Sequence, residues 1–265
     1  MTAATVWAGQ TWRGGLWGGV PQGQRRFRDS SAVALFARMT GLLPSRKELM
    51  NTYIAALKTA GVWDKLDVRQ ITAGSSEVNA LLNWKADAIN ATNNGATFTT
   101  NRGFAGDAAA TWVSTGFNPT SVAGQYVRDS AHMGFWIETD GADSDGHGAA
   151  TTAYVRHASG NLTGRINDAT TATFGAASAT GFHLLVRRGA SDKRGFVNGV
   201  QVGAPLTTAS TGIPNAIAGI GRWNTNATYT DDRVAMFTAG AALSDAEILA
   251  DYTATRAYMT GIGVA

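Results

Sequence analysis

The chain has 265 residues, of which 44% are hydrophobic and only 15% are charged, with 32 glycines and no cysteine. This length and apolar content suffice for one large or two small packed domains, and they exclude disorder driven by charge. The lack of cysteine excludes disulfides, thiolate metal sites and cysteine nucleophiles. Few charges with many small and turn-forming residues favour β-structure over surface helices.

The formal net charge of +3 comes entirely from the first quarter of the chain. Residues 1–70 hold ten Lys/Arg against four Asp/Glu (+6), whereas residues 71–265 hold twelve against fifteen (−3). We therefore expect no nucleic-acid partner for the folded body. The N-terminus lacks the pattern of a signal peptide, and no apolar run reaches 18 residues, so we also expect no membrane insertion.

The first 28 residues form a segment rich in tryptophan, glycine and arginine. The indoles of Trp7, Trp12 and Trp17 recur every five residues, which matches neither helix nor strand, so an irregular segment is expected. These rings either cover the chain's own body or dock onto another protein chain. The segment ends in a basic cluster, either a solvated linker or an anion-binding patch. This cluster consists of Arg25, Arg26 and Arg28.

Residues 29–94 are predicted to form a small helical region. A first helix begins at Asp29 or Ser30 and ends before Gly41, with its contact side formed by Val33, Phe36 and Thr40.

The second helix in this region is predicted from Ser45, which with Glu48 matches a capping box, to a C-terminal Gly61. Its apolar positions follow a 3.6-residue period. They are Leu49, Tyr53, Leu57 and Ala60. A short helical turn is expected over residues 76–82.

From about residue 95, short β-like runs alternate with Gly, Asn and Asp, which predicts a mainly β domain, an antiparallel sandwich or barrel, over residues 95–265. Asn198-Gly199 predicts a type I′ hairpin. A closing helix is predicted from a capping box of Ser244 and Glu247 to Gly261. The expected strands cover residues 111–114, 132–138, 152–155, 162–166, 182–188, 194–202, 216–221 and 233–237.

The enzyme hypotheses find little support in the residue inventory. The chain has four glutamates, and Glu138 is the only one in the β-rich region. With Asp140 it could form the carboxylate pair of a glycosidase, so a glycan hydrolase stays open as an alternative. Motifs for acyl transfer, phosphate binding and dinucleotide binding are absent from the sequence.

Two polar loops are candidate binding sites. The loop over residues 139–148 carries carboxylates suited to a hard cation such as Ca²⁺, although its spacing differs from that of an EF-hand and a hairpin loop rich in turn-forming residues is the favoured alternative. Its candidate metal ligands are Asp140, Asp143 and Asp145. The loop over residues 223–232 combines aromatic rings with amides and carboxylates, as a sugar site requires, and an ordinary loop is the alternative. Its candidate glycan-binding residues are Trp223, Asn224, Asn226, Tyr229 and Asp231.

Two stretches resemble known protein families. The run 233–248, which ends in Leu-Ser-Asp-Ala-Glu-Ile, resembles the closing strand and helix start of concanavalin A-like, laminin G-type jelly rolls, and the hairpin 196–203 resembles theirs. The runs 55–67, 80–85, 98–107 and 115–119 resemble a segment of virion proteins from tailed bacteriophages and related gene transfer agents. In those proteins this segment precedes a jelly roll in tail-fibre or spike components.

The resemblance implies a structural or adhesive component of a phage-like particle. The sandwich loops would bind a bacterial surface polysaccharide, and residues 1–28 would attach the chain to other virion proteins. The resemblance also implies a homo-oligomer on the particle surface, made in the bacterial cytoplasm without a signal peptide. An architectural virion protein without a ligand is the remaining alternative.

Overall fold

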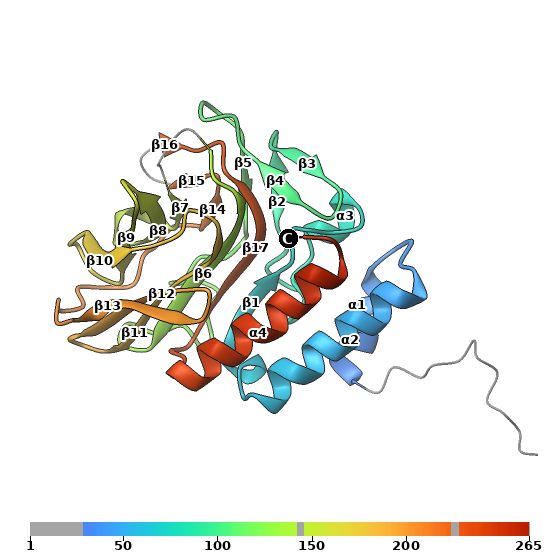
Figure 1. The fold of residues 1–265 in the computed structure, drawn as a ribbon, viewed down its shortest axis with the longest axis horizontal. Coiled ribbons are helices and arrows are strands. Elements are labelled where there is room, and N and C mark those ends of the chain that lie inside the picture. The colour runs from blue at the N-terminus through green and yellow to red at the C-terminus, as the bar shows by residue number, and fades with distance from the viewer. Residues whose placement is uncertain (1–28, 142–145, 224–227, 265) are drawn as a thin grey trace, which may run out of the picture.

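A computed structural model describes residues 29–141, 146–223 and 228–264 (Figure 1). Two mainly antiparallel sheets pack face to face, and helices cover the outer face of one of them. This confirms the predicted mainly β sandwich with helices near the N-terminus and at the C-terminus. The helices are α1 (Ser30–Arg38), α2 (Pro44–Thr59), η1 (Trp63–Lys65), α3 (Glu77–Ala80), η2 (Ala150–Thr152) and α4 (Asp245–Gly261).

The first sheet has eight strands in the order β13-β12-β11-β6-β17-β4-β3. Strand β17 pairs with β6 along one edge, and β4 and β1 share its other edge. The strands are β1 (Leu66–Gln70), β3 (Thr97–Thr99), β4 (Gly103–Ala105), β6 (Ala131–Thr139), β11 (Gly181–Gly189), β12 (Asp192–Val197), β13 (Val200–Leu206) and β17 (Arg233–Gly240).

The second sheet has nine strands in the order β10-β9-β8-β7-β14-β5-β2, and β15 and β16 extend it beside β7. Most of its strands are short. They are β2 (Thr92–Asn94), β5 (Trp112–Ser114), β7 (His147–Gly148), β8 (Ala153–Ala158), β9 (Asn161–Ile166), β10 (Ala172–Ala176), β14 (Gly219–Ile220), β15 (Arg222–Trp223) and β16 (Thr228–Tyr229).

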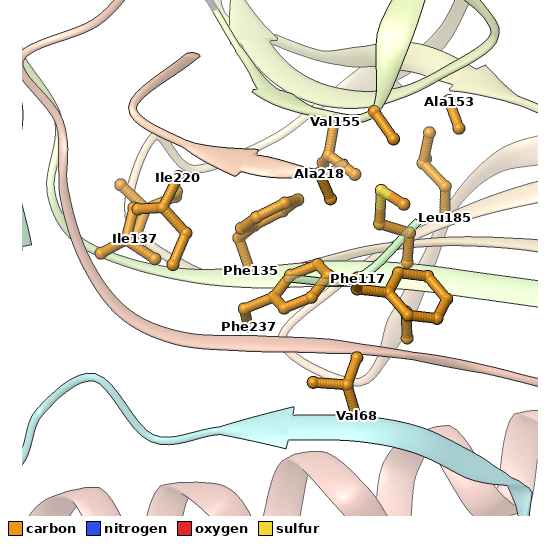
Figure 2. Packing of buried hydrophobic residues seen from close by; sticks show 14 of the residues in the cluster. Val68, Phe117, Phe135, Ile137, Ala153, Val155, Leu185, Ala218, Ile220 and Phe237 are labelled. Carbon is orange, nitrogen blue, oxygen red and sulfur yellow. The ribbon is translucent and has the colours of Figure 1, made fainter. Parts of the chain in front are cut away.

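The first sheet is buried on both faces because it lies between the second sheet and the helices. Side chains alternate along a strand, so β6 sends Phe135 into the core between the sheets (Figure 2) and Trp136 into the core under the helices. The neighbouring strand β11 does the same with Leu185 and Leu184. This explains why both strands are almost continuously buried and rich in apolar residues. The outer face of the second sheet lies on the far side of the sandwich from α1, α2 and α4 (Figure 1).

The region expected to be helical also supplies strands. Besides α1, α2 and α3, residues 29–94 contribute β1 to the first sheet and β2 to the second. Strand β1 lies under α4, where its Arg69 forms a fully buried ion pair with Asp251 at 2.7 Å. The segment 1–28 lies outside the described residues, so its role remains a prediction. None of the described helices is long and apolar enough to cross a membrane.

Two details of the predicted helices were wrong. Helix α2 begins at Pro44, one residue before the predicted cap, because the fixed φ of proline suits the first helical position, and Ser45 therefore lies inside the helix. Helix α1 buries Ala32 and Leu35 against α2, whereas Val33, expected on the contact side, is 50% exposed. The apolar face is thus rotated by about one residue.

The turn and cap signals elsewhere were confirmed. Asn198 and Gly199 have φ values of 53° and 80°, as a type I′ turn requires. The side chain of Ser244 accepts from the backbone of Glu247, and the Glu247 carboxylate accepts from the backbone of Ser244, which completes the capping box of α4. Helix α3 likewise begins at a Ser76 cap.

Candidate functional site

The two polar loops predicted from the sequence lie side by side at one end of the sandwich. Strand β6 ends at Thr139, which pairs with Arg233 at the start of β17, so the loop after β6 meets the loop before β17. The backbone N–H of Gly141 donates to Oδ1 of Asp232 at 2.8 Å. A side chain at Gly141 would overlap the carboxylate of Asp231, so close approach of the loops requires glycine here.

The structure describes only part of the predicted residue set. Trp223, Tyr229, Asp231 and Asp140 are described and belong to this end of the molecule. The remaining predicted ligands lie outside the described residues, so their roles stay predictions. These are Asn224, Asn226, Asp143 and Asp145.

Trp223 is held by aromatic and cationic neighbours on the outer face of the second sheet. Its ring stacks on Tyr154 with 3.8 Å between centroids, so Tyr154 occupies one face of the indole. Gly148 lies between the two residues in the strand register, and a Cβ there would be 2.7 Å from that of Tyr154. Glycine thus leaves the space through which the rings meet. The indole Nε1 is buried and has no hydrogen-bond partner in the part of the chain that the structure describes.

Tyr229 lies next to Trp223 through the pairing of β15 with β16. It pairs in register with Arg222, whose guanidinium carbon lies 5.4 Å from the Tyr229 ring centroid and 4.7 Å from that of Trp112. Trp112 is half-buried under this arginine. The cluster therefore presents partly exposed rings with cationic groups between them.

Behind the loops, a buried histidine positions a carboxylate. His147 packs against Phe135 with the two rings tilted by 39°, and its Nε2 lies 3.1 Å from Oδ2 of Asp232. Because Nδ1 of His147 accepts from the N–H of Gly221 at 2.9 Å, a neutral ring carries its proton on Nε2, facing the carboxylate. Burial acts to raise the pKa of Asp232, but the contact with His147 and the Gly141 N–H outweigh it, and the pKa is lowered.

Asp140 has the opposite electrostatic character. Partial burial and the nearby charge of Asp232 raise its pKa, although His157 at 3.8 Å works against this. Two residues earlier, Glu138 accepts from Nη1 of Arg102 at 2.8 Å and lies 3.7 Å from Nη1 of Arg233. The carboxylates proposed as a hydrolytic pair thus sit in different environments, one beside two arginines and one beside a second carboxylate.

The described residues do not form a metal centre. Among them, no group of three or more His, Asp or Glu side chains is placed to hold a metal ion. Of the three predicted calcium ligands, only Asp140 is described. Calcium binding by this loop therefore stays a prediction.

Three residues here were not predicted from the sequence: Arg156 and Arg165 contribute partly exposed side chains to this surface, and Tyr154, which is 1% exposed, supports Trp223 from beneath. Tyr154 and Arg156 alternate with the inward-facing Val155 on β8, and Arg165 on β9 pairs in register with Tyr154. The signal was present as period-two alternation. It was overlooked because the predicted strand ended at residue 155, where β8 in fact runs to Ala158.

The fold places the chain among antiparallel β-sandwich proteins. No protein-family model matches the chain, and no curated protein matches it in sequence. Solved structures of similar fold include the ligand-binding domain of botulinum neurotoxin serotype D with N-acetylneuraminic acid (TM-score 0.52, 12% identity, 75% of this chain and 52% of that chain). Another is Trypanosoma rangeli sialidase with sialic acid (TM-score 0.50, 10% identity, 79% of this chain and 39% of that chain).

The likeness to these structures is one of fold. The chain spans about half the length of the toxin domain and 39% of the sialidase. The binding domain of the same neurotoxin, described in a separate crystal structure, gives a similar match (TM-score 0.51, 13% identity, 74% of this chain and 52% of that chain).

Proposed function

We propose that the chain is a carbohydrate-binding component of a phage-like particle, which recognises a glycan on the host cell surface. One observation carries the proposal: loops about 90 residues apart in the sequence bring Trp223 and Tyr229 to the same end of the sandwich as Asp140 and Asp231. Partly exposed aromatic rings bind the apolar faces of sugar rings, and carboxylates accept from sugar hydroxyls.

The structural neighbours support a glycan ligand at the level of fold. The neurotoxin ligand-binding domain holds N-acetylneuraminic acid in its crystal structure, and the sialidase holds sialic acid. Both proteins therefore combine a similar β-sandwich with recognition of a sugar. The particle origin rests on the sequence resemblance to virion proteins.

Binding is tested with a panel of bacterial capsular and lipopolysaccharide glycans on a biosensor. Trp223→Ala is expected to weaken binding about tenfold, as removal of a central aromatic contact does. Phe36→Ala is the matched control, because Phe36 is a half-buried ring on the helical layer. Loss of binding in both variants, or in neither, would contradict the assignment of the site.

Attachment to the particle is assigned to residues 1–28, with other virion proteins and sister chains as partners. Large aromatic contacts can offset the ordering entropy of a short segment, and arginines steer it toward an acidic partner. Deletion of residues 1–28 is expected to abolish incorporation into particles while the remaining chain still binds glycan. Normal incorporation of the truncated chain would refute this role.

A glycan hydrolase is the second candidate, favoured by one observation. The raised pKa of Asp140 suits a general acid, and Glu138 would be its partner. This candidate predicts that the bound polysaccharide is shortened on incubation and that Glu138→Gln abolishes the shortening. The proposed binding role predicts an unchanged polymer length, read by size-exclusion chromatography. A protein with a purely architectural role would bind no glycan of the panel.

A further inference from the structure

The outer face of the second sheet has a one-sided charge. Its nine strands contain three arginines, Arg156, Arg165 and Arg222, and no aspartate or glutamate. The other described residues do not follow this pattern, because they hold 15 Lys or Arg side chains against 17 Asp or Glu side chains. Helices α1, α2 and α4 lie on the other sheet, so they leave this face uncovered (Figure 1).

Two of the arginines lie within cation–π distance of aromatic rings. The guanidinium carbon of Arg165 lies 5.7 Å from the Tyr154 ring centroid, and that of Arg156 lies 6.0 Å from the Trp223 centroid. With Arg222 and Tyr229 these residues form what we call the arginine–aromatic face. These ring contacts restrict the guanidinium groups before a ligand arrives, which lowers the entropy cost of binding.

Hydrogen bonds also hold the side chains of Arg165 and Arg156, and each guanidinium keeps N–H groups that these bonds do not use. Arg165 donates through Nε to Thr171 at 3.0 Å and through Nη1 to the carbonyl of Thr151 at 2.6 Å. Arg156 donates through Nε to Thr163 at 3.3 Å. Neither guanidinium lies within 4.0 Å of a carboxylate among the described residues. Both therefore retain charge and N–H groups for an external anion.

We propose that the arginine–aromatic face selects glycans that bear carboxylate groups, such as polymers of uronic or nonulosonic acids. This inference rests on the proposed function, since it names the class of glycan that the Trp223 site accepts. A guanidinium pairs with a carboxylate through two parallel hydrogen bonds, and the partly exposed rings of Trp223 and Tyr229 contact the apolar sugar faces.

Two other anionic partners fit the face less well. A nucleic acid requires a basic surface of many phosphate contacts, whereas the strands of this face supply only three arginines. The core of a protein interface requires exposed apolar side chains, and the large exposed ones among the described residues all lie off these nine strands. An acidic polysaccharide needs only a few fixed cations beside aromatic rings.

The test compares acidic polysaccharides with their carboxyl-reduced forms, in which each carboxylate becomes a neutral alcohol. The probes are polygalacturonate, alginate, hyaluronan and polysialic acid, and binding is measured by calorimetry at low salt. At least one acidic polymer is expected to bind, and its reduced form is expected to bind about tenfold more weakly or worse, with affinity falling as salt rises.

The variant Arg156→Gln/Arg165→Gln is expected to lose about tenfold in affinity for the acidic polymer and nothing for a neutral glycan. Arg256→Gln is the matched control, because Arg256 is an exposed arginine on α4. Thermal melting of each variant separates unfolding from lost recognition, and the carboxyl-reduced polymers test the native chain independently.

The outcomes separate the two proposals. Equal binding of acidic and reduced polymers, or an unaffected double variant, would overturn the selection of carboxylates while leaving glycan binding intact. Equally tight, arginine-dependent binding of a single-stranded oligonucleotide would also overturn it. If neither these polymers nor the bacterial glycans bind, the proposed function itself fails.

Discussion

The buried ion pair between Arg69 and Asp251 is expected to fix the helical layer on the first sheet. Both side chains are fully buried, and Nη2 lies 2.7 Å from Oδ2. The same carboxylate accepts from Thr255 at 3.1 Å. Asp251→Ala would leave the guanidinium buried without its counter-charge, which costs about 3–5 kcal/mol of unfolding free energy.

Helix α4 offers a matched control in Asp245, which pairs with Arg188 at the same distance of 2.7 Å but has a side chain that is 64% exposed. Asp245→Ala is expected to cost about 1 kcal/mol or less, because solvent screens an exposed pair. Urea unfolding at neutral pH measures both, and Asp251→Ala should lower the midpoint by roughly 1–2 M. Equal losses for the two variants would refute the view that burial makes the Arg69 pair important.

Three further predictions concern the buried His183, the cap of helix α4 and the stacking of Trp223 on Tyr154. Burial lowers the pKa of His183 from 6.5 to about 4, so the unfolded chain takes up this proton first, and stability should fall as pH drops through that window. Urea unfolding at pH 7 and at pH 5 measures how much free energy of unfolding is lost on acidification. This loss should be about 2 kcal/mol smaller in His183→Gln than in the native chain, and an identical loss would contradict the lowered pKa of His183. Ser244→Ala removes the cap of α4 and should cost about 1 kcal/mol in thermal melts, whereas an unchanged melting temperature would argue against the capping box. Gly148→Val should separate Trp223 from Tyr154 and reduce the near-ultraviolet circular dichroism of the stacked rings, and a native spectrum would show that glycine is not needed there.

Much of the fold could be predicted because its signals are local. The strands β6 and β11 are long and contain apolar runs, and the Asn198-Gly199 turn and the α4 capping box depend on residues close in sequence. Strand β1 was missed because Arg69 reads as a surface residue, and only its pairing with Asp251, 182 residues later, makes burial possible. Strands of two or three residues, such as β7, are too short to show periodicity.

For the candidate site too, local signals could be predicted from the sequence and long-range contacts could not. Trp223, Tyr229 and Asp231 were predicted from the composition of one loop, but composition does not reveal which loops meet. The contact between Gly141 and Asp232 depends on the pairing of β6 with β17, which the sequence alone does not specify. The arginine–aromatic face likewise arises only when β8, β9 and β15 are placed in one sheet.

A crystal structure of the chain with an acidic oligosaccharide, taken from the polymer that binds most tightly, would locate the ligand directly. Sugar rings are expected against Trp223 and Tyr229, with a carboxylate within hydrogen-bond distance of Arg156 or Arg165. An oligosaccharide bound instead against the helical layer of α1, α2 and α4 would contradict this expectation.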